Sequence, residues 1–348
     1  METSIKNLSE LEKFDLYEAI HSVFEKGLET KEVVYSPGAQ EPLIEDPVSK
    51  MTFQLKIVDG LGKRPYNRPV QPGETAQVTE EKVNEVKEKS PFMHPEPELT
   101  VIGDLIGDYR LLLNKFPNTE DHFLLVTKKF VKQDTLLEPI ELQLMYAILK
   151  NLNNTEELKR QGTKFFAFFN SGPESGYSQY HKHIQFMKLP EHFPIYQSRL
   201  TSDTNFFLPR ENNVNKHPLV NKNASFKHGI LKLKEEFKDA EEQETILAML
   251  YMFLVRRVLN VFKENGYSLD KLSYNFLMMD DWMMVVPRRH ARYEDVWQNS
   301  LGYMGLFNAK NEQVRQKMLD LGFSKILQEC GFPIEEQEEK ISYDEYSY

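Results

Sequence analysis

Residues 164–187, KFFAFFNSGPESGYSQYHKHIQFM, decide how this chain is expected to fold. The stretch opens with a short aromatic run, Lys164 to Asn170, passes through a segment containing glycine and serine, and ends with the run His181 to Met187. Both runs are too short for typical helices, and the first is rich in the aromatic residues that favour strands. They predict two buried strands paired as a hairpin.

The second run divides polar from apolar residues by face. Side chains two positions apart on a strand project from the same face, so His181, His183 and Gln185 share one surface. The opposite face carries one lysine and two apolar residues suited to a core: Lys182, Ile184 and Phe186. This pattern is typical of a strand that forms the floor of a polar site.

A loop that suits phosphate precedes the histidines. Between Asn170 and Gln179 it supplies hydroxyl and amide side chains together with Gly172 and Gly176. Glycine lets a ligand approach the backbone closely, and the amide N–H groups of such a loop can bind phosphate oxygens.

Two imidazoles at this spacing suggest either a metal site or a nucleophile. Zinc is the weaker interpretation, because Gln185 is a poor zinc ligand and the chain has one cysteine. Neutral imidazole can instead attack an electrophilic phosphorus without a separate base. The adjacent loop favours this second interpretation.

Hydrophobic periodicity predicts the remaining elements. We expect helices over residues 4–27, 138–153, 246–262 and 313–329, and strands over 51–58, 109–116 and 122–130, with a strand hairpin over 273–287. The hairpins around 109–130 and 273–287 have a similar texture, which predicts two related halves. Residues 65–98 predict a mobile surface excursion, and 331–348 a solvated acidic tail. Trp282 and Trp297 are expected to pack in the interior rather than stack on bases.

Composition predicts a globular, cytoplasmic or nucleocytoplasmic protein. The 348 residues are 40% hydrophobic and 12% aromatic, enough for a sizeable core. One cysteine cannot form an internal disulfide, and the opening METSIKNLSE lacks the apolar core of a leader. A net charge of -10 disfavours nucleic-acid and anionic-membrane partners, and no run approaches the roughly 20 apolar residues of a membrane span. An anionic substrate would therefore need a local cluster of cations.

Several separated phrases give the chain a family resemblance. Ser178 to Gln185, SQYHKHIQ, resembles the H-x-H-x-Q signature of the transferase branches of the histidine-triad superfamily. LNKF at 113–116, SYNFLM at 273–278 and NSLGYMG at 299–305 are similar to phrases of the fungal diadenosine tetraphosphate phosphorylases, also called ATP adenylyltransferases. The resemblance is collinear from about Met51 to Lys310. It implies an α+β histidine-triad-like fold, an antiparallel sheet with packed helices.

The resemblance also implies a reaction. Diadenosine 5',5'''-tetraphosphate (Ap4A) would be cleaved by inorganic phosphate to ATP and ADP, through AMP attached covalently to a histidine. By match to the motif, His183 is the nucleophile, His181 holds or polarises the site, and Gln185 binds a phosphate oxygen of the transferred nucleotide.

The resemblance further implies a set of substrate-binding residues. The substrate contacts would be Lys63, Asn114, Lys115, Asn170, Gly176, Tyr177, Ser178, Gln179, Gln185, Asn299, Ser300, Leu301, Leu306 and Lys310. Leu306 stands where the family commonly has methionine. We expect no organic cofactor and no protein-bound metal; a divalent cation such as Mg²⁺ would serve to neutralise charge. We also expect a monomer whose partners are the dinucleotide and phosphate.

The expected organisation is a catalytic half over 1–190 and a half over 191–330 that completes the nucleotide site. Two other functions are alternatives for a chain with this motif. A hexose-1-phosphate uridylyltransferase shares H-x-H-x-Q, but that branch commonly has proline where this chain has Lys182. A non-catalytic nucleotide-binding regulator would have no need of a nucleophile at His183.

Overall fold

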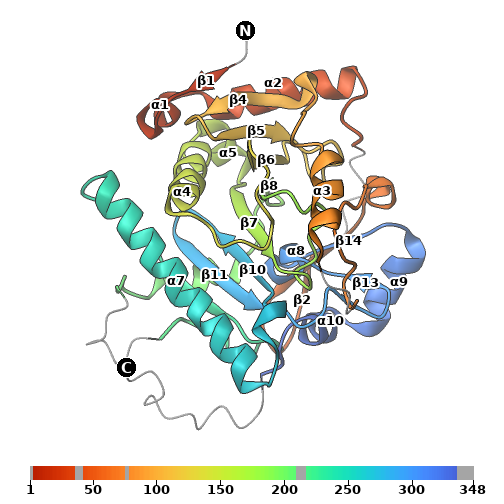
Figure 1. Ribbon diagram of the computed structural model, residues 1–348. Coiled ribbons are helices and arrows are strands. Elements are labelled where there is room, and N and C mark those ends of the chain that lie inside the picture. Colours follow the sequence, from red (N-terminus) through yellow and green to blue (C-terminus); the bar gives the residue numbers. More distant parts are fainter. Residues whose placement is uncertain (1–2, 36–41, 75–77, 209–216, 335–348) are drawn as a thin grey trace.

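A nine-stranded sheet forms the centre of the molecule (Figure 1). The computed structural model describes residues 3–35, 42–74, 78–208 and 217–334. Across the sheet the strands are β1 (Ser4–Ile5), β4 (Thr100–Leu105), β5 (Tyr109–Leu113), β6 (Phe123–Thr127), β8 (His183–Lys188), β7 (Phe165–Ser171), β10 (Tyr274–Met278), β11 (Trp282–Pro287) and β9 (Gly229–Lys232). Every neighbouring pair is antiparallel except β1 and β4, so the predicted α+β class is confirmed and the sheet is mixed.

The three hairpins expected from the sequence all lie in this sheet. β5 pairs with β6, β7 with β8, and β10 with β11. The strand β7 also pairs with β10, with Asn170 opposite Asn275, which joins the two expected halves into one sheet. The common origin of the halves and a domain boundary near residue 190 stay predictions.

The two faces of the sheet carry separate cores. Along β7, Phe165, Ala167 and Phe169 pack into the first core, while Phe166 and Phe168 pack into the second. This alternation follows from the two-residue repeat of a strand that is buried on both sides.

Different elements cover each face, as Figure 1 shows for α4 and α7 on one side and α8 and α10 on the other. The first core includes α1 (Leu8–Lys13), α2 (Leu16–Glu29), α4 (Pro139–Asn153), α5 (Glu156–Gln161) and α7 (Ala240–Glu264). The second includes α6 (Tyr196–Ser202), α8 (Ser300–Met304), α9 (Glu312–Leu321), α10 (Phe323–Cys330), β14 (Leu306–Ala309) and β3 (Thr52–Ile57). The strands β14 and β3 form a small sheet with the exposed strand β2 (Ile44–Glu45). A further pair, β12 (Arg292–Tyr293) and β13 (Val296–Trp297), lies before α8.

Two helices expected to be continuous are broken. The first is interrupted between α1 and α2, where the carboxylate of Asp15 accepts the N–H of Glu18 and caps a new helix. The last is divided into α9 and α10 by Gly322, whose φ of 80° is a left-handed conformation that glycine adopts without strain.

The segment 65–98 is more structured than the predicted surface excursion. Among its described residues are the helix α3 (Glu80–Glu88) and the buried residues Val86, Ser90 and Phe92. Its mobility stays a prediction. The solvated tail was predicted to begin at residue 331, but Phe332 is buried in the first core. The part of that prediction from 335 onward lies outside the described residues.

The helix α7 is the one described helix long and apolar enough to cross a membrane. Half of its most apolar 18-residue window is buried inside the protein. The side chains of Leu247, Leu250 and Leu254 belong to the first core, next to those of β11. This burial is what a core helix of a folded domain shows.

Candidate functional site

A cavity of about 430 Å³ opens beside the start of β8. Its walls come from segments far apart in the sequence: the end of β5, residues 61–68 and 91–96, the loop before His181, and the region from β13 to α9. Predicted site residues that line it are Asn114, Lys115, Gly176, Ser178, Gln179, His183, Gln185, Asn299, Leu301, Leu306 and Lys310.

The imidazole of His183 is fixed in one orientation. Its Nδ1 lies 2.8 Å from the carbonyl oxygen of His181, and its main-chain N–H donates to Oε1 of Gln133 at 2.8 Å. Because a carbonyl only accepts, Nδ1 carries the proton and the lone pair is on Nε2. Within the described part of the chain, no hydrogen bond reaches that Nε2. Burial lowers the pKa of His183 to about 4, so the ring is neutral near pH 7.

The side chain of His181 does not line the cavity. Its Nε2 lies 2.9 Å from the carbonyl oxygen of Thr127, and its Nδ1 accepts from Oγ of Ser90 at 2.8 Å. Burial lowers its pKa to about 4. Both ring nitrogens are therefore occupied, and what His181 gives His183 is its main-chain carbonyl.

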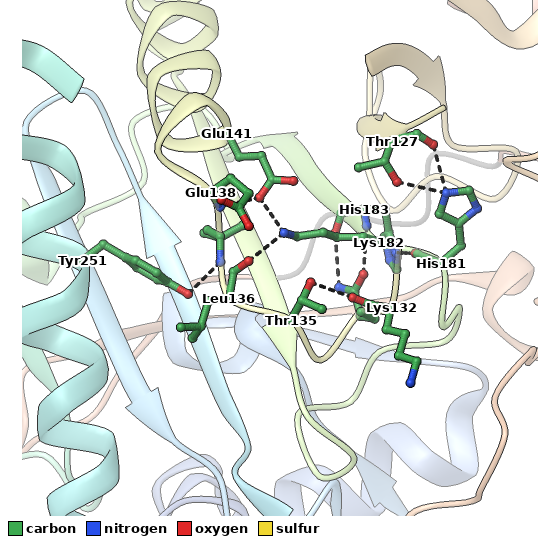
Figure 2. Close-up of polar contacts among 12 residues, drawn as sticks. Thr127, Lys132, Thr135, Leu136, Glu138, Glu141, His181, Lys182, His183 and Tyr251 are labelled. Carbon is green, nitrogen blue, oxygen red and sulfur yellow. Dashed lines mark hydrogen bonds and ion pairs between the residues drawn. The ribbon is translucent and has the colours of Figure 1, made fainter. Parts of the chain in front are cut away.

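Lys182 takes the opposite side of the strand, as the two-residue repeat predicts. Figure 2 shows its side chain directed to Glu141 and Leu136, away from the imidazole of His181. Its Nζ lies 2.6 Å from the carboxylate of Glu141 in α4, and both side chains are buried.

The amide of Gln185 is oriented by a histidine that the sequence did not single out as a site residue. Nδ1 of the buried His122 accepts the main-chain N–H of Asn118 at 3.3 Å, so its proton is on Nε2. That Nε2 lies 3.1 Å from Oε1 of Gln185. Burial, followed by the charge of Arg64, lowers the pKa of His122 to about 3, which keeps this arrangement neutral. Gln185 therefore directs its NH₂ group away from His122, and no described residue accepts a hydrogen bond from that group, which leaves it to donate to a ligand.

Asn170 lies behind the cavity wall. Its Oδ1 accepts from Nδ2 of Asn275 at 2.7 Å and from Oγ of Ser300 at 2.7 Å. Asn170 and Ser300 therefore hold the start of α8 against the sheet and do not line the cavity themselves.

Gly176 marks the closest approach of the predicted phosphate loop to the segment before α8. Its φ is 86°, and a Cβ added to it would lie 2.2 Å from the carbonyl oxygen of Gln298. The same region is held by the buried Arg288, which donates to the carbonyl oxygens of Ser175 and Gln298 at 3.2 and 2.9 Å.

Two of the three lysines expected at the site, Lys115 and Lys310, line the cavity, and Lys63 does not. Nζ of Lys115 is paired with Glu96 at 2.7 Å and with Glu32 at 3.4 Å. Lys310 is exposed where it lines the cavity. Lys63 is exposed at the end of a 3₁₀ turn (Asp59–Lys63) and does not line it.

Two arginines that follow Lys63 were not predicted from the sequence as site residues. Arg64 and Arg68 both line the cavity. The guanidinium of Arg64 donates to the carbonyl oxygen of Phe116 and, at 2.6 Å, to Oδ1 of Asn118. The run GKRPYNR at 62–68 is basic in an acidic chain and could have indicated this site, but the order of residues alone does not show which of its cations faces inward.

Other expectations are also changed by the structure. Tyr177 is buried beneath Arg68 and does not line the cavity. His94, which the sequence analysis did not place at the site, is exposed and lines the cavity. His228 lies away from the cavity, where it is buried and donates from Nδ1 to the carbonyl of Phe226 at 3.0 Å. Among the described residues no three His, Cys, Asp or Glu side chains are grouped to hold a metal ion.

Comparison with protein families identifies the chain. The model of the Ap4A phosphorylase N-terminal domain matches residues 7–200, and that of the ATP adenylyltransferase C-terminal domain matches 222–333. The chain belongs to the Ap4A phosphorylase family. This confirms the family predicted from the sequence and decides between the two transferase branches weighed there.

Two proteins of Saccharomyces cerevisiae are similar members of this family. Protein APA1 is 35% identical over 299 residues, 83% of this chain and 86% of that protein. Diadenosine 5',5'''-P1,P4-tetraphosphate phosphorylase 2 is 37% identical over 261 residues, 72% of this chain and 79% of that protein. The crystal structure of yeast Ap4A phosphorylase Apa2 in complex with Ap4A matches with a TM-score of 0.74 and 30% identity, covering 91% of this chain and 97% of that one.

Proposed function

We propose that this family member cleaves Ap4A with inorganic phosphate to ATP and ADP, through a covalent AMP attached to His183. One observation carries the assignment to His183. Its Nδ1–H is held by the carbonyl of His181, so the lone pair of Nε2 is left without a partner among the described residues, on a buried, neutral side chain that lines the cavity. This is the state that direct attack on phosphorus requires.

In the first transfer, Nε2 of His183 attacks the phosphorus of one adenylyl group. The new N–P bond forms as the bond from that phosphorus to its bridging oxygen breaks, and the electron pair leaves with ATP. The proton on Nδ1 stays on the imidazole. The positive charge that develops on the ring is stabilised by the carbonyl of His181, 2.8 Å away.

In the second transfer, an oxygen of inorganic phosphate attacks the same phosphorus. The N–P bond breaks, its electron pair returns to Nε2, and the product is ADP. Because attack and release occur at one ring nitrogen, no second nucleophilic side chain is required.

The charge on the transferred phosphate is stabilised by preorganised donors. The NH₂ group of Gln185 is directed away from His122, and main-chain N–H groups near Gly176 supply further donors. We propose that any divalent cation arrives bound to the polyphosphate, where Mg²⁺ commonly coordinates. A monomeric state and a cytoplasmic or nucleocytoplasmic location stay predictions.

An isotope experiment tests this function. Purified protein is given Ap4A and ¹⁸O-labelled phosphate, and the nucleotides are separated and weighed by mass spectrometry. We expect ATP and ADP in equal amounts, dependent on phosphate, with the label in the β-phosphate of ADP and none in ATP. Release of AMP without phosphate, or label in ATP, would contradict the proposal.

A pair of histidine variants tests the nucleophile. His183→Ala should bind Ap4A, form no acid-labile AMP adduct and lose turnover by at least about 1,000-fold. His192→Ala is the matched control, because this histidine is exposed and does not line the cavity. Turnover by His183→Ala at more than a tenth of the wild-type rate would remove the role given to His183.

A further inference from the structure

Arg68 is a buried cation that has no hydrogen bond or ion pair with a described residue. Its side chain is only 9% exposed, and its Nε and Nη1 atoms have no hydrogen bond there. The nearby carboxylate of Glu174 accepts instead from the main-chain N–H groups of Gly73 and Ala291, each at 2.8 Å. Burying an unpaired guanidinium is costly. Because Arg68 lines the cavity and its buried Nε and Nη1 donors are unsatisfied, its positive charge suits an anionic ligand there.

Three aromatic rings surround this guanidinium. Its central carbon lies 4.7 Å from the ring centre of Tyr177, 5.4 Å from Tyr66 and 5.9 Å from Trp297. Tyr177 is buried beneath it, but Tyr66 is 56% exposed and Trp297 is 40% exposed, and both of these line the cavity. Their ring centres are 6.3 Å apart. Exposed aromatic faces beside a cation are the surfaces on which nucleic-acid bases stack.

The cavity has a second apolar region, which is buried, unlike the exposed rings of Tyr66 and Trp297. Next to His183, Phe92 lies with its ring centre 5.4 Å from the imidazole, and it packs with Leu112 and Leu124. These side chains are buried and can enclose one base beside the nucleophile. A dinucleotide carries a second base at the far end of its phosphate chain, and that base needs another surface.

We propose that Arg68, Tyr66 and Trp297 bind the half of the dinucleotide that leaves as a nucleoside triphosphate. The guanidinium binds the phosphates beyond the one attacked by His183, and the second purine stacks on the exposed rings. The inference rests on the proposed function and adds a distal nucleoside site to it.

A substrate pair isolates the distal nucleoside. Adenosine 5'-tetraphosphate has the phosphate chain of Ap4A without the second adenosine. Trp297→Ala should lower kcat/KM for Ap4A about tenfold, the value of one base stack, and leave kcat/KM for adenosine 5'-tetraphosphate unchanged. Trp297→Phe keeps a ring and should restore most of the loss. Arg68→Gln should lower kcat/KM for both substrates, because both carry the phosphates.

The control is an exposed aromatic residue elsewhere. Tyr267 is 39% exposed, close to the 40% of Trp297, and does not line the cavity. Tyr267→Ala should leave the ratio of the two kcat/KM values as in the wild type. If Trp297→Ala changes both substrates equally, or neither, the distal site is overturned. If the wild type cleaves neither substrate, the proposed function itself fails, and the two failures are thereby distinguished.

Fluorescence gives a measurement that needs no turnover. The chain has two tryptophans, and Trp282 is fully buried, so a ligand-induced change in emission reports on Trp297. In the His183→Ala background, saturating Ap4A should quench this emission, and the further change Trp297→Phe should abolish the quenching. Binding of Ap4A, seen by calorimetry, with no change in emission would overturn the stacking.

Discussion

Lowering the pH from about 7.5 to about 5 should remove roughly 8 kcal/mol from the free energy of unfolding, because four buried histidines gain protons when the chain unfolds. Burial lowers the pKa of His122 to about 3 and the pKa values of His181, His183 and His228 to about 4. In the unfolded chain each returns to about 6.5.

The free energy of unfolding falls at low pH because the unfolded chain binds more protons than the folded one. A depressed pKa in the folded state means that the unfolded state binds more protons, so stability falls as pH falls from about 6.5 toward about 4. At pH 5 each histidine is almost fully protonated when unfolded and almost neutral when folded, a loss of about 2 kcal/mol each. The buried carboxyl of Glu141 acts in the opposite direction, because burial raises its pKa. The total is comparable with the whole stability of a typical domain, about 5–15 kcal/mol.

Urea unfolding at a series of pH values measures this loss. The emission of the buried Trp282 can follow unfolding, and the free energy of unfolding should fall by about 5 kcal/mol per pH unit between pH 6 and pH 5. In His228→Gln the slope should fall by about a quarter, because one titrating group is gone. A wild-type slope below about 1 kcal/mol per pH unit would refute the reasoning.

The same histidines separate unfolding from catalysis. The pKa of His183 is about 4, so the nucleophile stays neutral down to about pH 5. Formation of the AMP adduct, measured by rapid quench, should therefore keep its rate per folded molecule while the protein begins to unfold. A rate that falls with an apparent pKa near 6.5 would show that His183 is not protected as the structure indicates.

Two further substitutions test contacts around the catalytic strand. His122→Phe removes the donor to Oε1 of Gln185, and kcat should fall about tenfold with little change in KM. Adding Gln185→Ala to that variant should lower kcat by a much smaller factor than Gln185→Ala does alone, which a double-mutant cycle can measure. Lys182→Met leaves the carboxylate of Glu141 buried without its lysine and should lower the free energy of unfolding by about 3–5 kcal/mol, whereas Lys182→Met with Glu141→Leu should recover most of that loss in urea titrations.

Local pattern was enough to predict the centre of the fold. The two-residue repeat placed Ile184 and Phe186 in a core and His183 and Gln185 on the opposite face, and the structure agrees with both placements. Such a repeat is a property of consecutive residues, so it survives in the sequence. The burial of Lys182 could not be predicted in the same way, because its partner Glu141 lies in a helix far back along the chain.

The cavity was harder to predict than the strand that floors it. Phosphate-loop residues such as Gly176 belong to one continuous motif, and a motif can be recognised. Arg68 is different, because it indicates a ligand only through the absence of a paired carboxylate. That absence can be recognised only once the segments around Arg68, such as the one carrying Tyr177, have been placed in three dimensions. Trp297 was expected to pack in the interior, but it lies exposed beside that unpaired charge at the cavity. The sequence therefore located the reacting end of the substrate, and three-dimensional placement was needed to find where the departing end can bind.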